Sequence, residues 1–261
     1  DTGLFTHTTR EVWKHVFDTV LGGAPLTRVL VTHLHPDHVG CAGWLARKYD
    51  IDLWMTREEY LLCRVLVADT GRVAPDEGVH FYHAAGFPAD ALYNYKKMFG
   101  MFGKYVALLP EAYRRLKAGD RLDFAGHTWE VLVGRGHSVE HACFFDAERK
   151  LFVSGDQLLP TISSNVSVYP TEPNADPLKD WLDSLRMLLN RLPEDVLVLP
   201  AHGKPFRGAH ARLEALRTEH LERLEILLDK GREPRRAVDT FGDLFGRAIN
   251  DNNRIMATGE A

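Results

Sequence analysis

The chain has 261 residues, of which 45% are hydrophobic and 26% are charged, with 32 Lys and Arg against 36 Asp and Glu. This composition is that of an ordinary globular protein and excludes the disordered and fibrous classes. The net charge of −4 argues against a dedicated nucleic-acid binder, because that affinity depends on neutralising phosphates. The sequence has no apolar run of 18 residues, so a soluble protein without a membrane partner is expected.

The first 70 residues alternate between helical periodicity and short β-branched runs, which indicates an α/β class. Apolar residues recur at helical spacing before Gly22-Gly23, and the strand-like RVLVT segment follows. We expect, in chain order, a helix over 9–21, a strand over 28–32, a loop over 33–40, a helix over 40–49, a strand over 51–56 and a helix over 57–68.

The segment over about 70–118 breaks this rhythm and is expected to be a mostly helical insertion or lid, rich in aromatic residues between 81 and 105. Those aromatic side chains predict either an apolar wall for an acyl group of the substrate, or a helical core, or a homodimer face. Beyond the insertion we expect strands within 121–134, 141–146 and 151–156, a helix over 177–192, a strand over 195–200 and charged helices from about 208 onward.

The three cysteines are an odd number, are widely spaced and lack a C-x-x-C pair. They therefore indicate neither a disulfide framework nor a zinc ribbon. Each is expected to be a small buried apolar residue, and a reducing cytoplasm is the expected compartment. These cysteines are Cys41, Cys63 and Cys143.

Four metal-ligand side chains occur within six residues directly after the first expected strand, in the pattern His33-x-His35-x-Asp37-His38. Imidazole and carboxylate groups bind zinc, iron and manganese, and a loop at a strand end can turn all four inward. Three more donors follow later apolar runs, where loops at strand ends present site residues. These donors are His137, Asp156 and His202. The sequence therefore predicts one convergent metal site.

Five short motifs occur in chain order: D-T-G at the start, then H-L-H-P-D-H, G-H-S-x-E-H, S-G-D and P-A-H-G. Together they resemble the motifs of the metallo-β-lactamase superfamily from residue 1 to about 207. The resemblance is to its glyoxalase II-like metal-dependent hydrolases. It implies an αββα sandwich with a dinuclear site at one edge of the sheets. By this resemblance His33, His35 and His137 hold one metal ion, Asp37, His38 and His202 hold the other, and Asp156 bridges them.

The chain departs from the family pattern in two places. A strand usually precedes D-T-G, so we expect this chain to begin inside the fold without its N-terminal strands. In the G-H-S-x-E-H motif, Val139-Glu140 stands where the corresponding G-H-T-x-G-H motif of the glyoxalase II and lactonase branches has x-Gly. This difference separates the chain from those branches. The expected helical extension over 208–261 resembles the winged-helix-like appendage of another branch, which includes an endoribonuclease. The predicted domains are accordingly 1–207, catalytic, and 208–261, appended.

The resemblance implies that two divalent ions, zinc first and iron or manganese as alternatives, generate a bridging hydroxide as the nucleophile. Asp37 would be the catalytic residue that orients the bridging water, and Ser138 is not needed as a nucleophile. Asp1, Thr32 and Glu140 are candidates to hold the imidazoles in place, whereas His141 is expected to begin a strand.

A small-molecule thioester is the first predicted substrate, because a thiolate leaves with a modest pKa and needs no strong general acid. Lactone or β-lactam hydrolysis is the nearest alternative. A metal-dependent ribonuclease, suggested by the appendage, and a non-hydrolytic iron enzyme are further alternatives.

Overall fold

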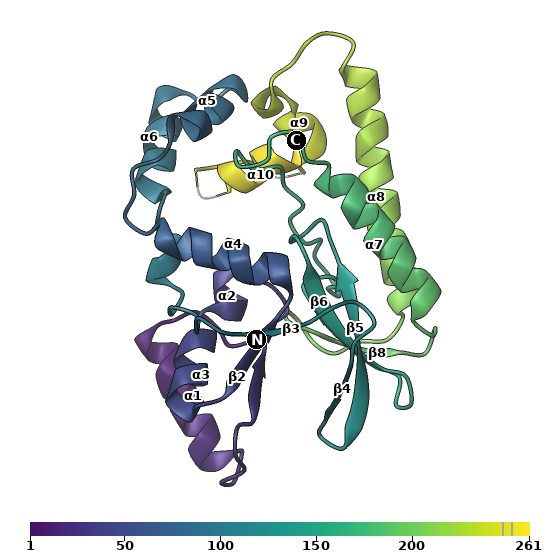
Figure 1. Ribbon diagram of the computed structural model, residues 1–261. Coiled ribbons are helices and arrows are strands. Elements are labelled where there is room, and N and C mark those ends of the chain that lie inside the picture. The colour runs from purple at the N-terminus through teal and green to yellow at the C-terminus, as the bar shows by residue number, and fades with distance from the viewer. Residues whose placement is uncertain (247, 252) are drawn as a thin grey trace.

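The computed structural model describes residues 1–246, 248–251 and 253–261. Two β-sheets face each other and helices cover the outer side of each, which is the predicted αββα sandwich (Figure 1). Arg247 and Asn252, within the predicted C-terminal extension, lie outside the described residues. Of the helices described, none is both long and apolar enough to cross a membrane.

The first sheet is parallel and has the order β1-β2-β3. Arg28 of β1 pairs with Asp52 of β2, and Trp54 of β2 pairs with Arg114 of β3. Helices from the first third of the chain pack against its outer face through apolar side chains. The elements are α1 (His7–Thr19), β1 (Arg28–Leu30), α2 (Pro36–Val39), α3 (Ala42–Tyr49), β2 (Asp52–Met55), α4 (Arg57–Ala68) and β3 (Arg114–Arg115).

The second sheet has the order β4-β5-β6-β7-β8, in which only β7 and β8 run parallel. Its central strand β6 is buried on both faces: Ala142 and Phe144 face the other sheet, whereas Cys143 and Phe145 face the covering helices. The elements are β4 (Arg121–Phe124), β5 (His127–Gly134), β6 (His141–Asp146), β7 (Leu151–Gly155), α7 (Pro177–Arg191), β8 (Leu197–Pro200) and α8 (Ala209–Lys230).

Helices α7 and α8 lie side by side on the outer face of this sheet (Figure 1). Trp181 and Leu185 of α7 and Leu213 of α8 are fully buried against it. Phe152 and Val198 provide the sheet side of the same core. Burial of such large apolar side chains, each worth about 1.5–3 kcal/mol, fixes the sheet against the helices.

The segment over 70–118 contains α5 (Asp76–Ala84), α6 (Ala89–Met98), a short 3-10 helix η1 (Phe102–Lys104) and β3. Tyr82, Phe87 and Tyr95 form a small core of their own, and Val238 and Ile255 of the C-terminal segment pack against it. Of the three roles considered for these aromatic residues, this packing favours the helical core. The C-terminal segment continues with η2 (Ala237–Thr240), α9 (Phe241–Leu244) and α10 (Arg254–Glu260).

Most of the expected elements are present with ends displaced by a few residues, and one expectation was wrong. The stretch over 33–40, expected as a loop, contains the four-residue helix α2. Pro36 occupies its first turn, where proline costs no hydrogen bond, and Asp37 lies in the same turn, where helix N-termini favour negative charge. The domain division at 207 and the winged-helix resemblance stay predictions.

Candidate metal centre

The strand directions bring distant segments of the chain to one edge of the sandwich. Strands β5, β7 and β8 end at the same edge, because β6 is antiparallel to β5 and β7 while β8 is parallel to β7. His137, Asp156 and His202 follow these three ends. The first sheet joins at the same edge, where Ala142 of β6 donates a backbone hydrogen bond to Thr32, just after β1.

The seven side chains nominated from the sequence lie together there. Ligand atoms of His33, His35 and His137 all lie within 4.8 Å of one another, and so do those of Asp37, His38 and His202. We call these the three-histidine group and the Asp37 group. The fold thus brings residues as far apart in the sequence as His33 and His202 into two adjacent sets of donors.

Asp156 lies between the two groups. One of its carboxylate oxygens is 3.4 Å from Nε2 of His38 and 3.5 Å from Nε2 of His137. The other oxygen is 3.6 Å from Nε2 of His202. A single carboxylate therefore faces both sets of donors, which is the position that a bridging ligand requires.

Hydrogen bonds on the far side of the rings decide which imidazole nitrogens carry lone pairs. Nδ1 of His137 lies 2.8 Å from the carbonyl oxygen of Asn165, and a carbonyl can only accept, so Nδ1 carries the proton. Nδ1 of His38 lies 2.9 Å from the Asp1 carboxylate, with the same consequence. In the neutral form of either ring, Nε2 is then a lone pair aimed into the cluster.

Three of these inward-facing atoms are buried and have no hydrogen-bond partner: Nε2 of His38, Nε2 of His137 and Oδ1 of Asp156. A buried polar atom without a partner costs about 1–3 kcal/mol, so three that point toward one another demand an explanation. Lone pairs on imidazole and carboxylate are what a divalent cation would satisfy. The donor set therefore fits a metal ion.

Burial controls the protonation of the cluster. It lowers the pKa of His35 to about 3 and the pKa of His33 well below its usual value, so both rings are neutral at pH 7. For His38, burial lowers the pKa, but the Asp156 and Asp37 carboxylates outweigh this effect and raise it. The neighbouring His38 lowers the pKa of Asp37 to about 2, which keeps that carboxylate ionised.

The cluster is most exposed at Asp37 and His202. His33 is fully buried and His38 is 2% exposed, whereas the side chains of Asp37 and His202 are 45% and 47% exposed. Nε2 of His202 is 3.2 Å from the Asp37 carboxylate. Asp37 and His202 therefore form the mouth through which a substrate would reach the buried donors.

Supporting contacts confirm two of the predicted candidates. The Asp1 carboxylate accepts hydrogen bonds from the backbone and hydroxyl of Thr32, in addition to its contact with His38. The Thr32 hydroxyl oxygen lies 2.9 Å from Nδ1 of His33. These contacts connect the first residue to both ligand groups.

Glu140, the third candidate, contacts the start of α4. Its carboxylate accepts from the backbone N–H of Glu58 at the start of α4. His141 begins β6 as expected, and its Nε2 also accepts from the backbone N–H of Asp156 at 3.1 Å. Sequence reasoning missed Glu59, a fully buried carboxylate that accepts from the backbone N–H of Leu34 at 2.8 Å and of Glu140 at 2.9 Å.

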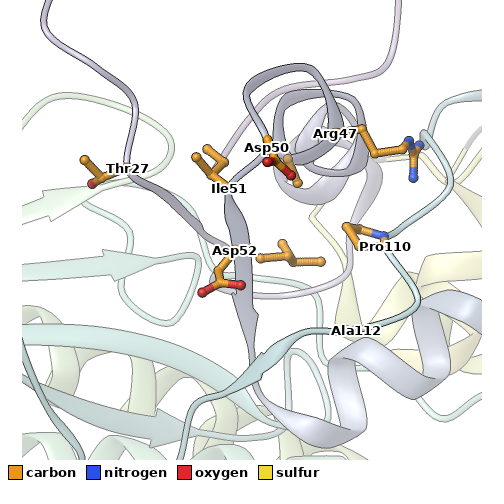
Figure 2. Close-up of a pocket in the computed structure, with 9 residues that line it drawn as sticks. Thr27, Arg47, Asp50, Ile51, Asp52, Pro110 and Ala112 are labelled. Atoms are coloured by element: carbon orange, nitrogen blue, oxygen red, sulfur yellow. The ribbon is translucent and has the colours of Figure 1, made fainter.

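A separate surface hollow of about 400 Å³ lies at the other end of the first sheet. Figure 2 shows Thr27, Arg47 and Asp52 around it. Thr27 and Asp52 stand at the beginnings of β1 and β2, whereas the histidine cluster follows the end of β1. This hollow is therefore not part of the metal centre.

Comparisons with known proteins agree with this geometry. The family model described as the metallo-beta-lactamase superfamily matches residues 1–202. A beta-lactamase domain protein from Burkholderia ambifaria has a similar solved structure, with a TM-score of 0.88 and 36% identity, over 100% of this chain and 74% of that one.

Two curated relatives are more distant in sequence. Hydroxyacylglutathione hydrolase GloC from Haemophilus influenzae is 25% identical over 175 residues, which span 67% of this chain and 68% of that protein. Atrochrysone carboxyl ACP thioesterase from Aspergillus fumigatus is 24% identical over 219 residues, which span 83% of this chain and 38% of that protein.

Proposed function

We propose that this chain, which belongs to the metallo-β-lactamase superfamily of metal-dependent hydrolases, uses two metal ions to hydrolyse a small-molecule thioester. The observation that carries the proposal is the set of buried ligand atoms on His38, His137 and Asp156 that have no hydrogen-bond partner. In this assignment the three-histidine group would hold one ion, the Asp37 group would hold the other, and Asp156 would be a ligand to both.

Zinc is the metal that we propose first. Imidazole nitrogen with one or two carboxylates is a common zinc ligand set, and iron or manganese would accept the same donors. Charge supports divalent cations of some kind: within the described residues, Asp37 and Asp156 form ion pairs only with histidines, and no Lys or Arg side chain lies within ion-pair distance of either.

The bound ions would supply a water molecule of lowered pKa, from 15.7 toward about 7, and a positive charge to polarise the substrate carbonyl. The chain's own residues provide the setting. Burial keeps His33 and His35 neutral, so each ring retains one nitrogen lone pair at pH 7, although Nε2 of His33 and Nδ1 of His35 share a hydrogen bond of 2.9 Å that an ion would replace. Asp37, ionised and at the mouth, is placed to accept a hydrogen bond from the attacking water and so to orient it.

The substrate class is proposed from the relatives and from leaving-group chemistry. One relative is named for hydroxyacylglutathione and another for an acyl carrier protein thioesterase, and both names describe acyl groups on sulfur. A thiolate leaving group with a pKa near 8.5 leaves without a strong general acid. The proposed reaction therefore needs no group beyond the metal centre and Asp37.

Thiol release by the zinc-loaded protein tests the proposal, with lactoylglutathione and a long-chain acyl-coenzyme A measured side by side. We expect zinc-dependent release from at least one, and none from a His35→Ala control. The preferred substrate would define the acyl pocket. No release from either compound with two ions bound would overturn the thioester assignment and favour a lactone, a β-lactam or RNA, each of which can be tested in the same protein sample.

A further inference from the structure

Glu59 connects the two segments that carry the three-histidine group without belonging to it. It lies in the first turn of α4 and is fully buried. One carboxylate oxygen accepts from the backbone N–H of Leu34, the residue between His33 and His35. The other accepts from the backbone N–H of Glu140, three residues after His137. One side chain therefore spans from one ligand segment to the other.

The position requires a carboxylate, because the two N–H donors approach different oxygens and both oxygens must accept. Glutamine has one acceptor oxygen, and its NH2 group would face an N–H. Burial raises the pKa of Glu59, and this rise is opposed by a hydrogen bond from the Ser138 side chain and by the backbone N–H groups of Glu140 and Leu34.

A second set of contacts attaches the same turn of α4 to the His137 segment. The Thr56 hydroxyl donates to the carbonyl oxygen of Glu140 at 2.7 Å, and the Glu140 carboxylate accepts from the backbone N–H of Glu58 at 2.9 Å. Thr56 is the N-cap residue of α4 and is itself buried. The start of α4 thus acts as a rigid support between the segments.

We propose that Glu59 is a positioning residue that sets the separation of the His33–His35 and His137 segments, and thereby the affinity of the three-histidine group for its metal ion. The inference rests on the proposed metal centre and deepens it. The effect should be selective, because the two Glu59 hydrogen bonds reach Leu34 and Glu140, beside the three-histidine group, whereas His38 of the Asp37 group is held by Asp1. Loss of Glu59 should therefore weaken one ion and not the other.

The test measures zinc affinity by competition with a chromophoric chelator in two backgrounds. A His202→Ala background keeps the three-histidine group, and a His35→Ala background keeps the Asp37 group. Contacts outside the ligand shell typically change metal affinity by about 10- to 100-fold, so we expect Glu59→Gln to weaken zinc binding at least about 10-fold in the first background. Binding in the second background should not change.

The matched control is Glu58→Gln, which removes the same charge from an exposed side chain on the same turn and should change neither background. If Glu59→Gln does not fold, Thr56→Val removes one hydrogen bond to the same segment and should produce a smaller loss, again only in the first background.

Equal losses in both backgrounds, or no loss in the first, would show that Glu59 is ordinary scaffolding and would overturn the inference. Absence of zinc binding by the parent chain would overturn this inference and the proposed metal centre together. Zinc binding without thioester hydrolysis would overturn the substrate assignment alone and leave the role of Glu59 standing.

Discussion

Nδ1 of His137 donates a hydrogen bond to the carbonyl oxygen of Asn165 across 2.8 Å, although the two residues lie on different loops. The Asn165 loop is in turn attached to the C-terminal helix α10. Val168 donates to the carbonyl oxygen of Gly259, and the Ser167 hydroxyl donates to that of Met256. The orientation of one proposed metal ligand therefore depends on a helix more than 100 residues away in the sequence.

This relationship predicts that Gly259→Val weakens zinc binding. A Cβ at Gly259 would lie 2.5 Å from Cβ of Ser167, so the loop that orients His137 must shift. We expect a loss of about 10-fold in zinc affinity, the size typical of contacts outside the ligand shell. Gly242→Val is the control, because no atom lies within 4 Å of a Cβ there. Equal zinc affinity in the two variants would show that the packing of α10 does not affect the metal centre.

Removing a proposed ligand should abolish turnover while preserving the fold. His35→Ala and Asp156→Ala are each expected to lower thiol release by more than about 100-fold, beyond the usual effect of a supporting residue. Far-UV circular dichroism should remain that of the parent, because neither side chain belongs to the apolar cores. More than a few per cent of activity in both variants would contradict the metal assignment.

The glycine before His137 should be irreplaceable for steric reasons. Gly136 has a positive φ of 97°, and a Cβ there would lie 2.5 Å from Cβ of Trp181 and 2.6 Å from its backbone nitrogen on α7. Gly136→Ala should therefore displace His137 and reduce bound zinc, measured per chain by atomic absorption. Gly119→Ala carries similar backbone strain, with φ of 83°, but meets no atom within 4 Å. Equal zinc content in the two variants would disprove the steric effect.

The metal-free protein should lose stability in mild acid. Burial lowers the pKa of His35 to about 3, whereas the same ring titrates near 6.5 in the unfolded chain. Below pH 6.5 the unfolded state binds a proton that the folded state does not. The free energy of unfolding is therefore highest above pH 6.5 and falls as the pH approaches the folded value, by up to about 1.4 kcal/mol per pH unit for each such ring.

Urea unfolding in the presence of EDTA at pH 7.5 and pH 5.5 measures this effect. The midpoint should be lower at pH 5.5, and the difference should shrink in His35→Asn, which removes one buried ring. A midpoint that is unchanged or higher at pH 5.5 would show that these rings do not oppose protonation in the folded state.

Local sequence determined the elements whose signals lie within one segment. Helix α4 covers 57–68 as predicted, and two acidic residues in its first turn favour the helix N-terminus. Strand β6 covers 141–146 as predicted, because a continuous apolar run fits a strand buried on both faces. Helix α2 was missed because four residues are too few to show helical periodicity.

The sequence by itself also predicted which side chains would carry the chemistry, since seven His and Asp residues follow the ends of predicted strands. Only the tertiary structure decided how they are arranged and supported. Glu59 contacts residues 25 and 81 positions away, and within its own helix it has no signal that separates it from a solvated glutamate. Long-range contacts of this kind depend on how strands pair and helices dock, which is a property of the whole packed chain.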